Sequence, residues 1–342
     1  MTRGPRWTLL AVLTAVLSVT LGVVASSGKT GPVGDDTTTS TSPNGDSSSG
    51  EGGKAGKVFT IPGATVFPEG IALDKSGSGE TFFVSSTTDG TIFKGNKKAT
   101  ALAPFAAGGA DGRTTATGLT IDKGRLFVSG TGTGKAFVLS TSDGRTLKVL
   151  DTAPGTTPTF INDVTVGGGY VYFTDSLRPI IFRAATSGAT VGDIEPWLDL
   201  TGTPFVYQTG FNANGIVNYD DGRILVVVQA NTGKLFRVNT KTKAVTEIDL
   251  GGRTVVNGDG LVAHGSRLYV MQRADNQITE VELRNGKRSG RIGNVRKSDL
   301  FASPTTAARD GSRLLVVNSQ FDKRCPGLTP VLPFTVVSVE KP

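Results

Sequence analysis

Cysteine and histidine are nearly absent from this 342-residue chain, which contains one of each, Cys325 and His264. A single cysteine excludes an intramolecular disulfide, a cysteine-based metal site and a redox pair. A single histidine excludes a multi-histidine site for redox copper, iron or manganese, and a Ser-His-Asp triad would have to use His264. We expect Cys325 to be an unreactive thiol and His264 to lie in a surface turn away from any central site.

A dense run of basic residues interleaved with aromatics is also missing, although 36 Lys and Arg stand against 29 Asp and Glu, a net charge of +7. This mild excess predicts a solvated basic surface and no nucleic-acid partner. No helix-period segment of any length follows the N-terminal region, so the chain is expected to be all-β.

The long apolar run that the chain does contain is at its N-terminus. Arg3 and Arg6 precede it, and it ends near Ala25. This pattern predicts a signal peptide or an uncleaved signal anchor over residues 1–26. Residues 27–56 are rich in Gly, Ser, Thr and Asp, which predicts a disordered linker. We therefore expect the remainder, residues 57–342, to be secreted or held at the cell envelope.

A six-fold internal repeat is the dominant pattern of that remainder. A polar residue in front of an apolar strand recurs at steps of 48, 45, 52, 45 and 46 residues. A period of this length, built from short strands, predicts a β-propeller. The six polar positions are Glu69, Thr117, Asn162, Asn214, Asp259 and Thr305.

Each repeat continues with a second strand that is a near-continuous apolar and aromatic run, as expected for strands covered on both faces. A third strand follows, and most repeats add a more polar fourth, such as residues 244–248. The sixth repeat runs out of chain after its third strand, whereas residues 57–62 provide a spare strand before the first repeat. The sequence therefore predicts a six-bladed propeller of four-stranded blades, closed by the N-terminal strand.

In a propeller the first strand of each blade lines the central channel, so the six polar side chains would form a ring at one mouth. Glu69 and Asp259 bring two negative charges, and Asn162 and Asn214 bring amide oxygens, which together suit a hard divalent cation. Asp163 adds a carboxylate close by. The alternative is structural, because such residues followed by glycine also suit turns in which glycine adopts positive φ. The shared register of the set favours the metal site.

The motifs Glu69-Gly70, Asn162-Asp163, Asn214-Gly215 and Asp259-Gly260 resemble those of the SMP-30/gluconolactonase-like propellers, which are metal-dependent lactonases related to strictosidine-synthase-like propellers. The similarity covers roughly residues 58–342. It implies that Glu69, Asn214 and Asp259 hold one divalent cation, with Ca²⁺ expected first and Zn²⁺, Mg²⁺ or Mn²⁺ as alternatives. It also implies that Asp259 is the general base and that Asn162 binds the metal's water or the substrate.

One position departs from the sugar-lactone members of that family, which carry an arginine where this chain has Phe160. An apolar ring there favours a less polar lactone or ester over an aldonolactone. The long step into the fourth repeat adds a loop over residues 204–211, whose aromatics could cover a substrate or pack on the rim. The predicted substrate contacts are Asn162, Asp163, Phe160 and Tyr207.

These patterns predict a secreted, metal-dependent hydrolase of a lactone or related ester, with Asp259 and Asn162 as catalytic residues and a small molecule as substrate. Two alternatives stay open: a non-catalytic binding propeller displayed at the cell envelope, and a metal-independent strictosidine-synthase-like enzyme that uses Glu69 as acid and base. We expect a monomer, no nucleic-acid partner, and contact with a membrane only through the N-terminal segment.

Overall fold

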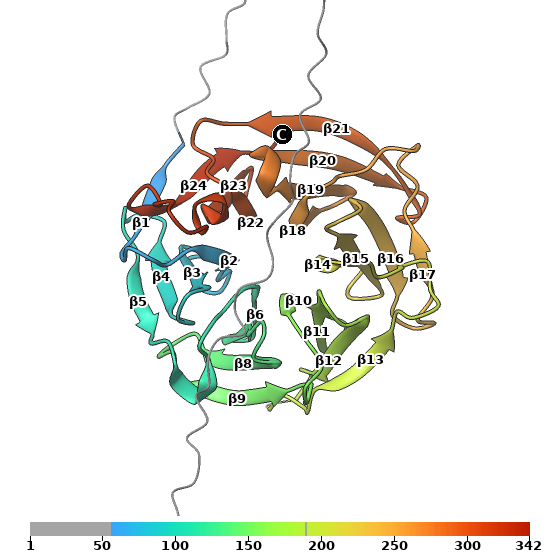
Figure 1. Ribbon diagram of the computed structural model, residues 1–342, viewed down its shortest axis with the longest axis horizontal. Helices are drawn as coiled ribbons and strands as arrows, with labels where there is room; N and C mark the ends of the chain where they lie inside the picture. Colours follow the sequence, from blue (N-terminus) through green and yellow to red (C-terminus); the bar gives the residue numbers. More distant parts are fainter. Residues whose placement is uncertain (1–55, 189) are drawn as a thin grey trace, which may run out of the picture. The chain divides into compact units, whose positions relative to one another are not determined.

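The computed structural model describes residues 56–188 and 190–342 of the chain. Six antiparallel sheets of four strands each surround a central axis, and each sheet is one blade of a propeller (Figure 1). The predicted all-β, six-bladed fold is confirmed. The predicted signal segment, residues 1–26, lies outside the described residues. So does the predicted linker, residues 27–56, except for Gly56.

Within each of the first five blades the strands follow one another in chain order from the axis outwards. The first three blades consist of β2 (Pro68–Leu73), β3 (Thr81–Ser86), β4 (Ile92–Asn96) and β5 (Ala103–Ala106); β6 (Leu119–Asp122), β7 (Arg125–Ser129), β8 (Lys135–Ser140) and β9 (Thr146–Asp151); and β10 (Ile161–Gly167), β11 (Tyr170–Asp175), β12 (Ile180–Ala185) and β13 (Glu195–Asp199). The fourth and fifth consist of β14 (Ala213–Tyr219), β15 (Ile224–Gln229), β16 (Lys234–Asn239) and β17 (Val245–Glu247); and β18 (Gly258–His264), β19 (Arg267–Gln272), β20 (Gln277–Arg284) and β21 (Ser289–Lys297).

The sixth blade is built from both ends of the propeller. Its inner strands are β22 (Pro304–Asp310), β23 (Arg313–Asn318) and β24 (Phe334–Glu340), and β1 (Val58–Ile61) is its outermost strand. β1 pairs antiparallel with β24, with Val58 opposite Val337 and Ile61 opposite Phe334. This is the closure that the spare N-terminal strand predicts, and it leaves the ring no gap between the first and last blades.

The hydrophobic core is divided among the six junctions between neighbouring blades. Each of six buried clusters combines side chains of two adjacent blades. In β3, for example, Phe82 and Val84 pack toward the sixth blade, while Phe83 packs toward the second. The second strand of each blade is therefore buried on both faces, which explains its continuous apolar run.

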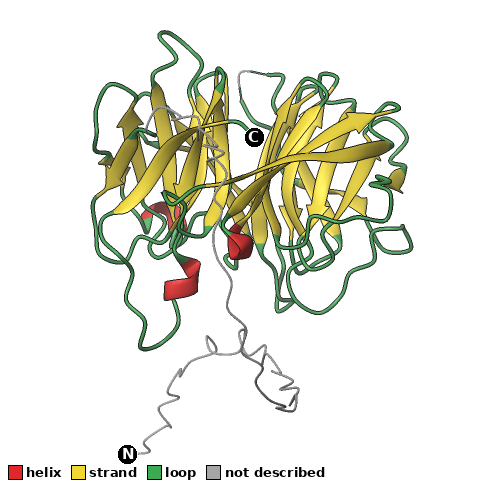
Figure 2. Ribbon diagram, turned by 90° about the horizontal axis from the view of Figure 1, so that it is seen from above, coloured by secondary structure: helices red, strands yellow, loops and turns green. Residues whose placement is uncertain are grey.

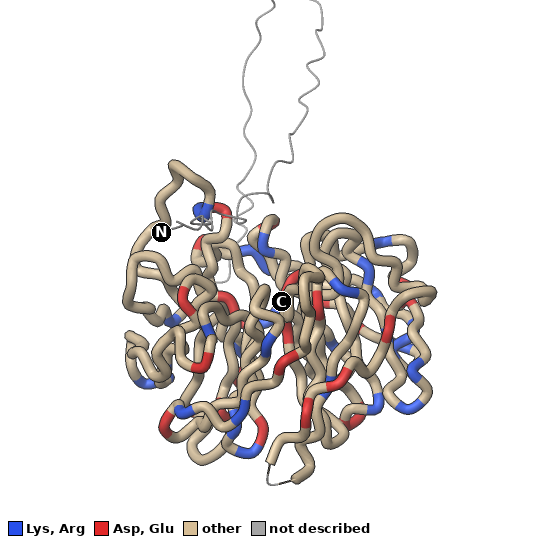
Figure 3. Tube along the Cα trace, turned by 60° about the horizontal axis from the view of Figure 1, so that its bottom comes forward, with Lys and Arg blue, Asp and Glu red and all other residues tan. Residues whose placement is uncertain are grey.

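One face of the propeller carries the starts of the inner strands, and we call it the mouth. Three short 3-10 helices lie at one face of the propeller in Figure 2: η1 (Ala110–Gly112), η2 (Arg273–Asp275) and η3 (Phe321–Lys323). Each comes shortly before an inner strand or directly after a second strand, so this face is the mouth. Basic and acidic residues are interspersed over the described chain (Figure 3). No helix in residues 56–188 or 190–342 is long and apolar enough to cross a bilayer.

Candidate functional site

The six predicted side chains start their blades as expected, and the backbone is irregular at five of them. A β-bulge interrupts the pairing of the first two strands at Glu69, Asn162, Asn214, Asp259 and Thr305. A bulge inserts an extra residue and re-aims the local side chains, and bulges are common beside active sites. The repeated bulge therefore gives these five residues a common orientation at the mouth.

The glycines that follow three of these residues allow the blades to approach one another closely. A Cβ atom on Gly70 would lie 2.2 Å from the Thr117 carbonyl oxygen, and one on Gly215 would lie 2.3 Å from that of Asp259. Neither these two glycines nor Gly260 has a positive φ. The structural alternative assumed glycines with positive φ, and that assumption is wrong at these three positions. Glycine is needed there because the neighbouring blade leaves no room for a Cβ atom.

Hydroxyl groups tie neighbouring blades together around the mouth. The Thr117 Oγ1 donates to the Asn162 carbonyl oxygen at 2.8 Å, and the Thr305 Oγ1 donates to that of Glu69 at 3.0 Å. Ser85 and Thr174 bridge blades in the same way, to the carbonyl oxygens of Thr117 and Asn214. The two threonines of the predicted ring thus hold the ring together.

Glu69, Asn214 and Asp259 form an electrostatically coupled group, although they come from three different blades. Glu69 and Asp259 are each only 6% exposed. Burial raises the pKa of Glu69 well above its ordinary value, and the charges of Asp259 and Asp163 raise it further. Burial also raises the pKa of Asp259 to about 6, while Arg273 and a polar contact with Asn214 lower it. Two buried carboxyl groups that disfavour each other's charge thus share one site.

Two oxygen atoms of this group have no hydrogen-bond partner among the residues that the structure describes. Glu69 Oε2 and Asn214 Oδ1 are buried and unpartnered. Buried polar atoms are normally paired, so each such atom calls for an explanation, such as a bound ion. Within the described residues no three His, Cys, Asp or Glu side chains gather closely enough to hold a metal by themselves. A cation at this site would therefore need the Asn214 amide oxygen as a ligand.

Asn162 is fixed by the blade that carries it. Its Nδ2 donates to Ser176 Oγ at 2.8 Å, and Ser176 Oγ donates to the Ala213 carbonyl oxygen at 2.7 Å. The amide nitrogen is therefore turned toward the junction between the third and fourth blades. This orientation leaves the side-chain oxygen of Asn162 as the free end of the amide.

Asp163 occupies the position that is glycine in four other blades, and its carboxylate reaches across to the fourth blade. Oδ1 accepts the Val164 N–H at 2.8 Å, and Oδ2 accepts the Ile216 N–H at 3.1 Å. Burial raises the pKa of Asp163 to about 7 against these two hydrogen bonds, and the charge of Asp259 also raises it. Asp163 thus links the third and fourth blades, and its charge raises the pKa of Glu69 at the mouth.

The aromatic residues predicted to contact substrate lie in two different environments. Phe160 and Phe211 are partly exposed and meet edge to face, with ring centroids 4.9 Å apart. The Tyr207 hydroxyl donates to the Asp175 carbonyl oxygen at 2.6 Å, and its ring packs against buried Phe205. The 204–211 loop therefore packs through its first half and presents Phe211 beside Phe160 through its second.

A fully buried carboxylate holds this region in place. Asp175 Oδ1 accepts the Phe160 N–H at 2.9 Å, and Oδ2 forms an ion pair with Arg178 Nε at 2.6 Å. Because Phe160 is held two residues before Asn162, Asp175 fixes the path by which the chain enters β10. Sequence reasoning missed Asp175, which ends a second strand and carries no motif.

Three further mouth residues, Arg273, Phe321 and Arg324, were also missed, because they lie between second and third strands, where the residues differ from blade to blade. Arg273 Nε lies 3.3 Å from Asp259 Oδ2, and its guanidinium lies 6.0 Å from the Phe321 ring centroid. The Arg324 guanidinium lies 5.9 Å from the Phe321 ring centroid and 5.4 Å from the Phe67 ring centroid. The last blade's insertion thus brings an aromatic ring and a second guanidinium to the mouth. No spacing in the sequence signals this arrangement.

Comparisons with known proteins identify the fold and no family. No protein-family model matches the chain, and no curated protein matches it in sequence. The major allergen Mala s 1 of Malassezia sympodialis has a similar structure, with a TM-score of 0.61 and 14% sequence identity over 82% of this chain and 95% of the allergen. A luciferin-regenerating enzyme is similar with a TM-score of 0.57 and 13% identity, over 83% of this chain and 94% of the enzyme. At these identities the likeness shows the propeller fold alone.

Proposed function

We propose that this protein hydrolyses a lactone or a related ester with the help of a divalent cation held by Glu69, Asn214 and Asp259. The observation that carries the proposal is the pair of buried, unpartnered oxygens, Glu69 Oε2 and Asn214 Oδ1, beside the Asp259 carboxylate. Similarity to the fold of a luciferin-regenerating enzyme is consistent with an enzyme but does not define a reaction.

The donor set fits a hard cation. Two carboxylates and an amide supply oxygen ligands and two negative charges, which suits Ca²⁺ first and Mg²⁺, Mn²⁺ or Zn²⁺ as alternatives. Burial is the main cause of the raised pKa values of Glu69 and Asp259, and a bound cation would offset it by favouring the charged forms of both groups. When bound, such a cation would polarise the carbonyl of the substrate and lower the pKa of a bound water.

The residues around the donors can supply the rest of the chemistry. Asp259, with a pKa raised to about 6, is suited to accept the proton of the attacking water near neutral pH. Asn162 is oriented through Ser176 and can position the carbonyl oxygen of the substrate. The edge-to-face pair Phe160 and Phe211 offers an apolar wall, which favours a lactone or ester with little polarity beyond its ester group.

A metal-independent enzyme is the second candidate, and Arg273 is the observation that favours it. Its guanidinium lies 3.3 Å from Asp259 and lowers the pKa of both mouth carboxyl groups. A fixed cation on Asp259 could partly replace a metal ion. Glu69, whose pKa is strongly raised, would then act as acid and base.

The N-terminal sequence pattern supports secretion or attachment at the cell envelope, where the chain would act on a small molecule as a monomer. The charged n-region and apolar run are the features on which this location rests.

The test begins with binding. We expect chelator-treated protein, titrated calorimetrically with Ca²⁺ and then with Zn²⁺, to bind one ion per chain. Asp259→Ala should abolish this binding and reduce hydrolysis across a lactone and ester panel by at least about 100-fold while the protein remains folded. Asp275→Ala removes an exposed aspartate at the same face and serves as the matched control, with binding and hydrolysis unchanged.

The outcomes separate the candidates. Hydrolysis that persists after chelation would support the metal-independent enzyme. Binding of the ion without hydrolysis of any substrate in the panel would support a non-catalytic propeller. A folded Asp259→Ala variant with wild-type hydrolysis would rule out the proposed base.

A further inference from the structure

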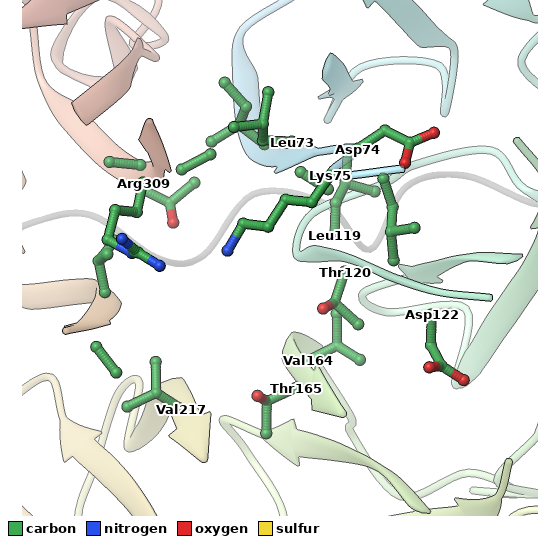
Figure 4. A pocket seen from close by; sticks show the side chains of 18 of the residues that line it. Leu73, Asp74, Lys75, Leu119, Thr120, Asp122, Val164, Thr165, Val217 and Arg309 are labelled. Atoms are coloured by element: carbon green, nitrogen blue, oxygen red, sulfur yellow. The ribbon is translucent and has the colours of Figure 1, made fainter. Parts of the chain in front are cut away.

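A cavity of about 470 Å³ fills the central channel behind the mouth ring. It is lined by the later residues of all six inner strands, so it lies toward the face opposite the mouth. Figure 4 shows Lys75 and Arg309 extending into this space from the first and sixth blades, with their charged ends turned toward each other. Thr120 and Thr165 contribute hydroxyl groups to the opposite wall.

Neither of these two cations has an acidic partner within the residues that the structure describes. No ion pair of Lys75 or Arg309 occurs there, whereas the neighbouring acidic residues are engaged elsewhere. Asp310 pairs with Lys97 at 2.7 Å, and Asp122 pairs with Arg125 at 2.7 Å. Asp74 accepts hydrogen bonds from Ser76 and points away from the cavity (Figure 4).

Positive charge continues around this opening of the channel. Partial burial and the charge of Arg309 both lower the pKa of Lys75. Burial and the charges of Arg309 and Arg267 lower the pKa of Lys341, whose Nζ lies 3.3 Å from His264 Nδ1. The basic groups here repel one another, and an anion placed between them would convert that repulsion into attraction.

We propose that the channel opening opposite the mouth binds a phosphate dianion, free or as the phosphate group of a small molecule, between Lys75 and Arg309. A doubly charged anion matches the two facing cations, and an arginine fork and a lysine ammonium are the usual protein partners of phosphate. The hydroxyls of Thr120 and Thr165 add polar groups to the wall across the same cavity. The cavity is large enough to hold the organic part of a phosphate monoester as well.

The test is a calorimetric titration of the full chain at low ionic strength. Inorganic phosphate and glycerol phosphate are the two probes, and chloride at matched ionic strength is the reference. We expect one phosphate site per chain. Tighter binding of glycerol phosphate would identify the natural ligand as an esterified phosphate, and tighter binding of inorganic phosphate would identify it as the free ion.

Variants locate the site. Lys75→Gln and Arg309→Gln should each weaken phosphate binding about ten-fold, and the double variant about 100-fold. Lys75 is exposed, so its substitution leaves folding intact and keeps the test valid even if the Arg309 variant is unstable. Lys241→Gln removes an exposed basic charge from a hairpin turn of the fourth blade and should leave binding within about two-fold of wild type.

Two results would overturn the proposal. One is wild-type affinity for both probes no greater than for chloride. The other is equal affinity of wild type and Lys75→Gln.

Discussion

At the scale of single residues, one position in each repeat decides how the mouth is built. The residue after the mouth side chain is glycine in the first, second, fourth and fifth blades, but it is Asp163 in the third and Thr306 in the sixth. Where it is glycine, atoms of the next blade occupy the place that a Cβ atom would take. Where it is Asp163, the side chain reaches across and accepts the Ile216 N–H instead. The same position thus joins blades by contact or by hydrogen bond.

We predict that Gly215→Ala disturbs the site through packing alone. The added Cβ would meet the Asp259 carbonyl oxygen at 2.3 Å and Leu261 Cγ at 2.9 Å, so the fifth blade must move away. Overpacking of this kind costs about 1–3 kcal/mol. Urea unfolding should show this loss, and calorimetry should show weaker cation binding.

The control for this variant is Gly132→Ala. Gly132 has no positive φ, and its nearest neighbouring atom would lie 3.9 Å from the added Cβ. Its stability and binding should match wild type. Equal stability of both variants would mean that the blades tolerate the extra methyl group.

At the scale of elements, the bulge at the start of five inner strands and the strand that closes the ring do the most to shape the molecule. The bulge sets the direction of the mouth side chains and also turns Asp163 toward the fourth blade. β1 closes the sixth blade with alternating burial, because Phe59 and Ile61 are buried while Val58 and Thr60 are partly exposed. Four residues of strand therefore complete the core between the first and last blades.

We predict that Phe59→Ala strongly destabilises the propeller. Phe59 is 2% exposed and meets Phe82 edge to face, with ring centroids 5.2 Å apart. Removal of a buried phenylalanine side chain costs about 3–5 kcal/mol. Thr60→Ala, on the other face of the same strand, should cost far less. Urea midpoints measured for both variants decide this, and similar midpoints would contradict a closing role for the buried face of β1.

At the scale of the whole molecule, three buried carboxyl groups make stability depend on pH. Burial raises the pKa of Glu69, of Asp259 to about 6 and of Asp163 to about 7. The folded protein therefore binds more protons than the unfolded chain between the ordinary carboxyl pKa and these raised values. The free energy of unfolding that these groups contribute is largest below the ordinary carboxyl pKa. It falls as the pH rises through the raised pKa values.

We predict that chelator-treated protein melts several degrees lower at pH 8 than at pH 5, as measured by calorimetry or circular dichroism. Asp163→Asn, which removes one titrating group, should reduce this difference. A melting temperature that is constant or increases from pH 5 to pH 8 would show that these groups are not buried as described.

The sequence predicts what repeats and little of what does not. The steps between Glu69 and Thr305 locate all six inner strands, because a strand buried between blades must be apolar in every repeat. The closing strand follows from counting strands. The mouth residues follow from their shared register, although their roles stay predictions. Arg273 and Arg324 could not be predicted, because both lie in connections between second and third strands whose residues differ from blade to blade. The orientation of Asp163 depends on a bulge that has no sequence signal.

The pairing of β1 with β24 also sets the order in which the protein can mature during synthesis. Val58 can pair with Val337 only after Val337 has left the ribosome, nearly three hundred residues later. Until then the first blade exposes the apolar side of its sheet, and the bond from Thr305 to Glu69 is absent. Apolar surface exposed in this way makes an incomplete chain prone to aggregation. The closed ring can therefore form only after β24 has been synthesised.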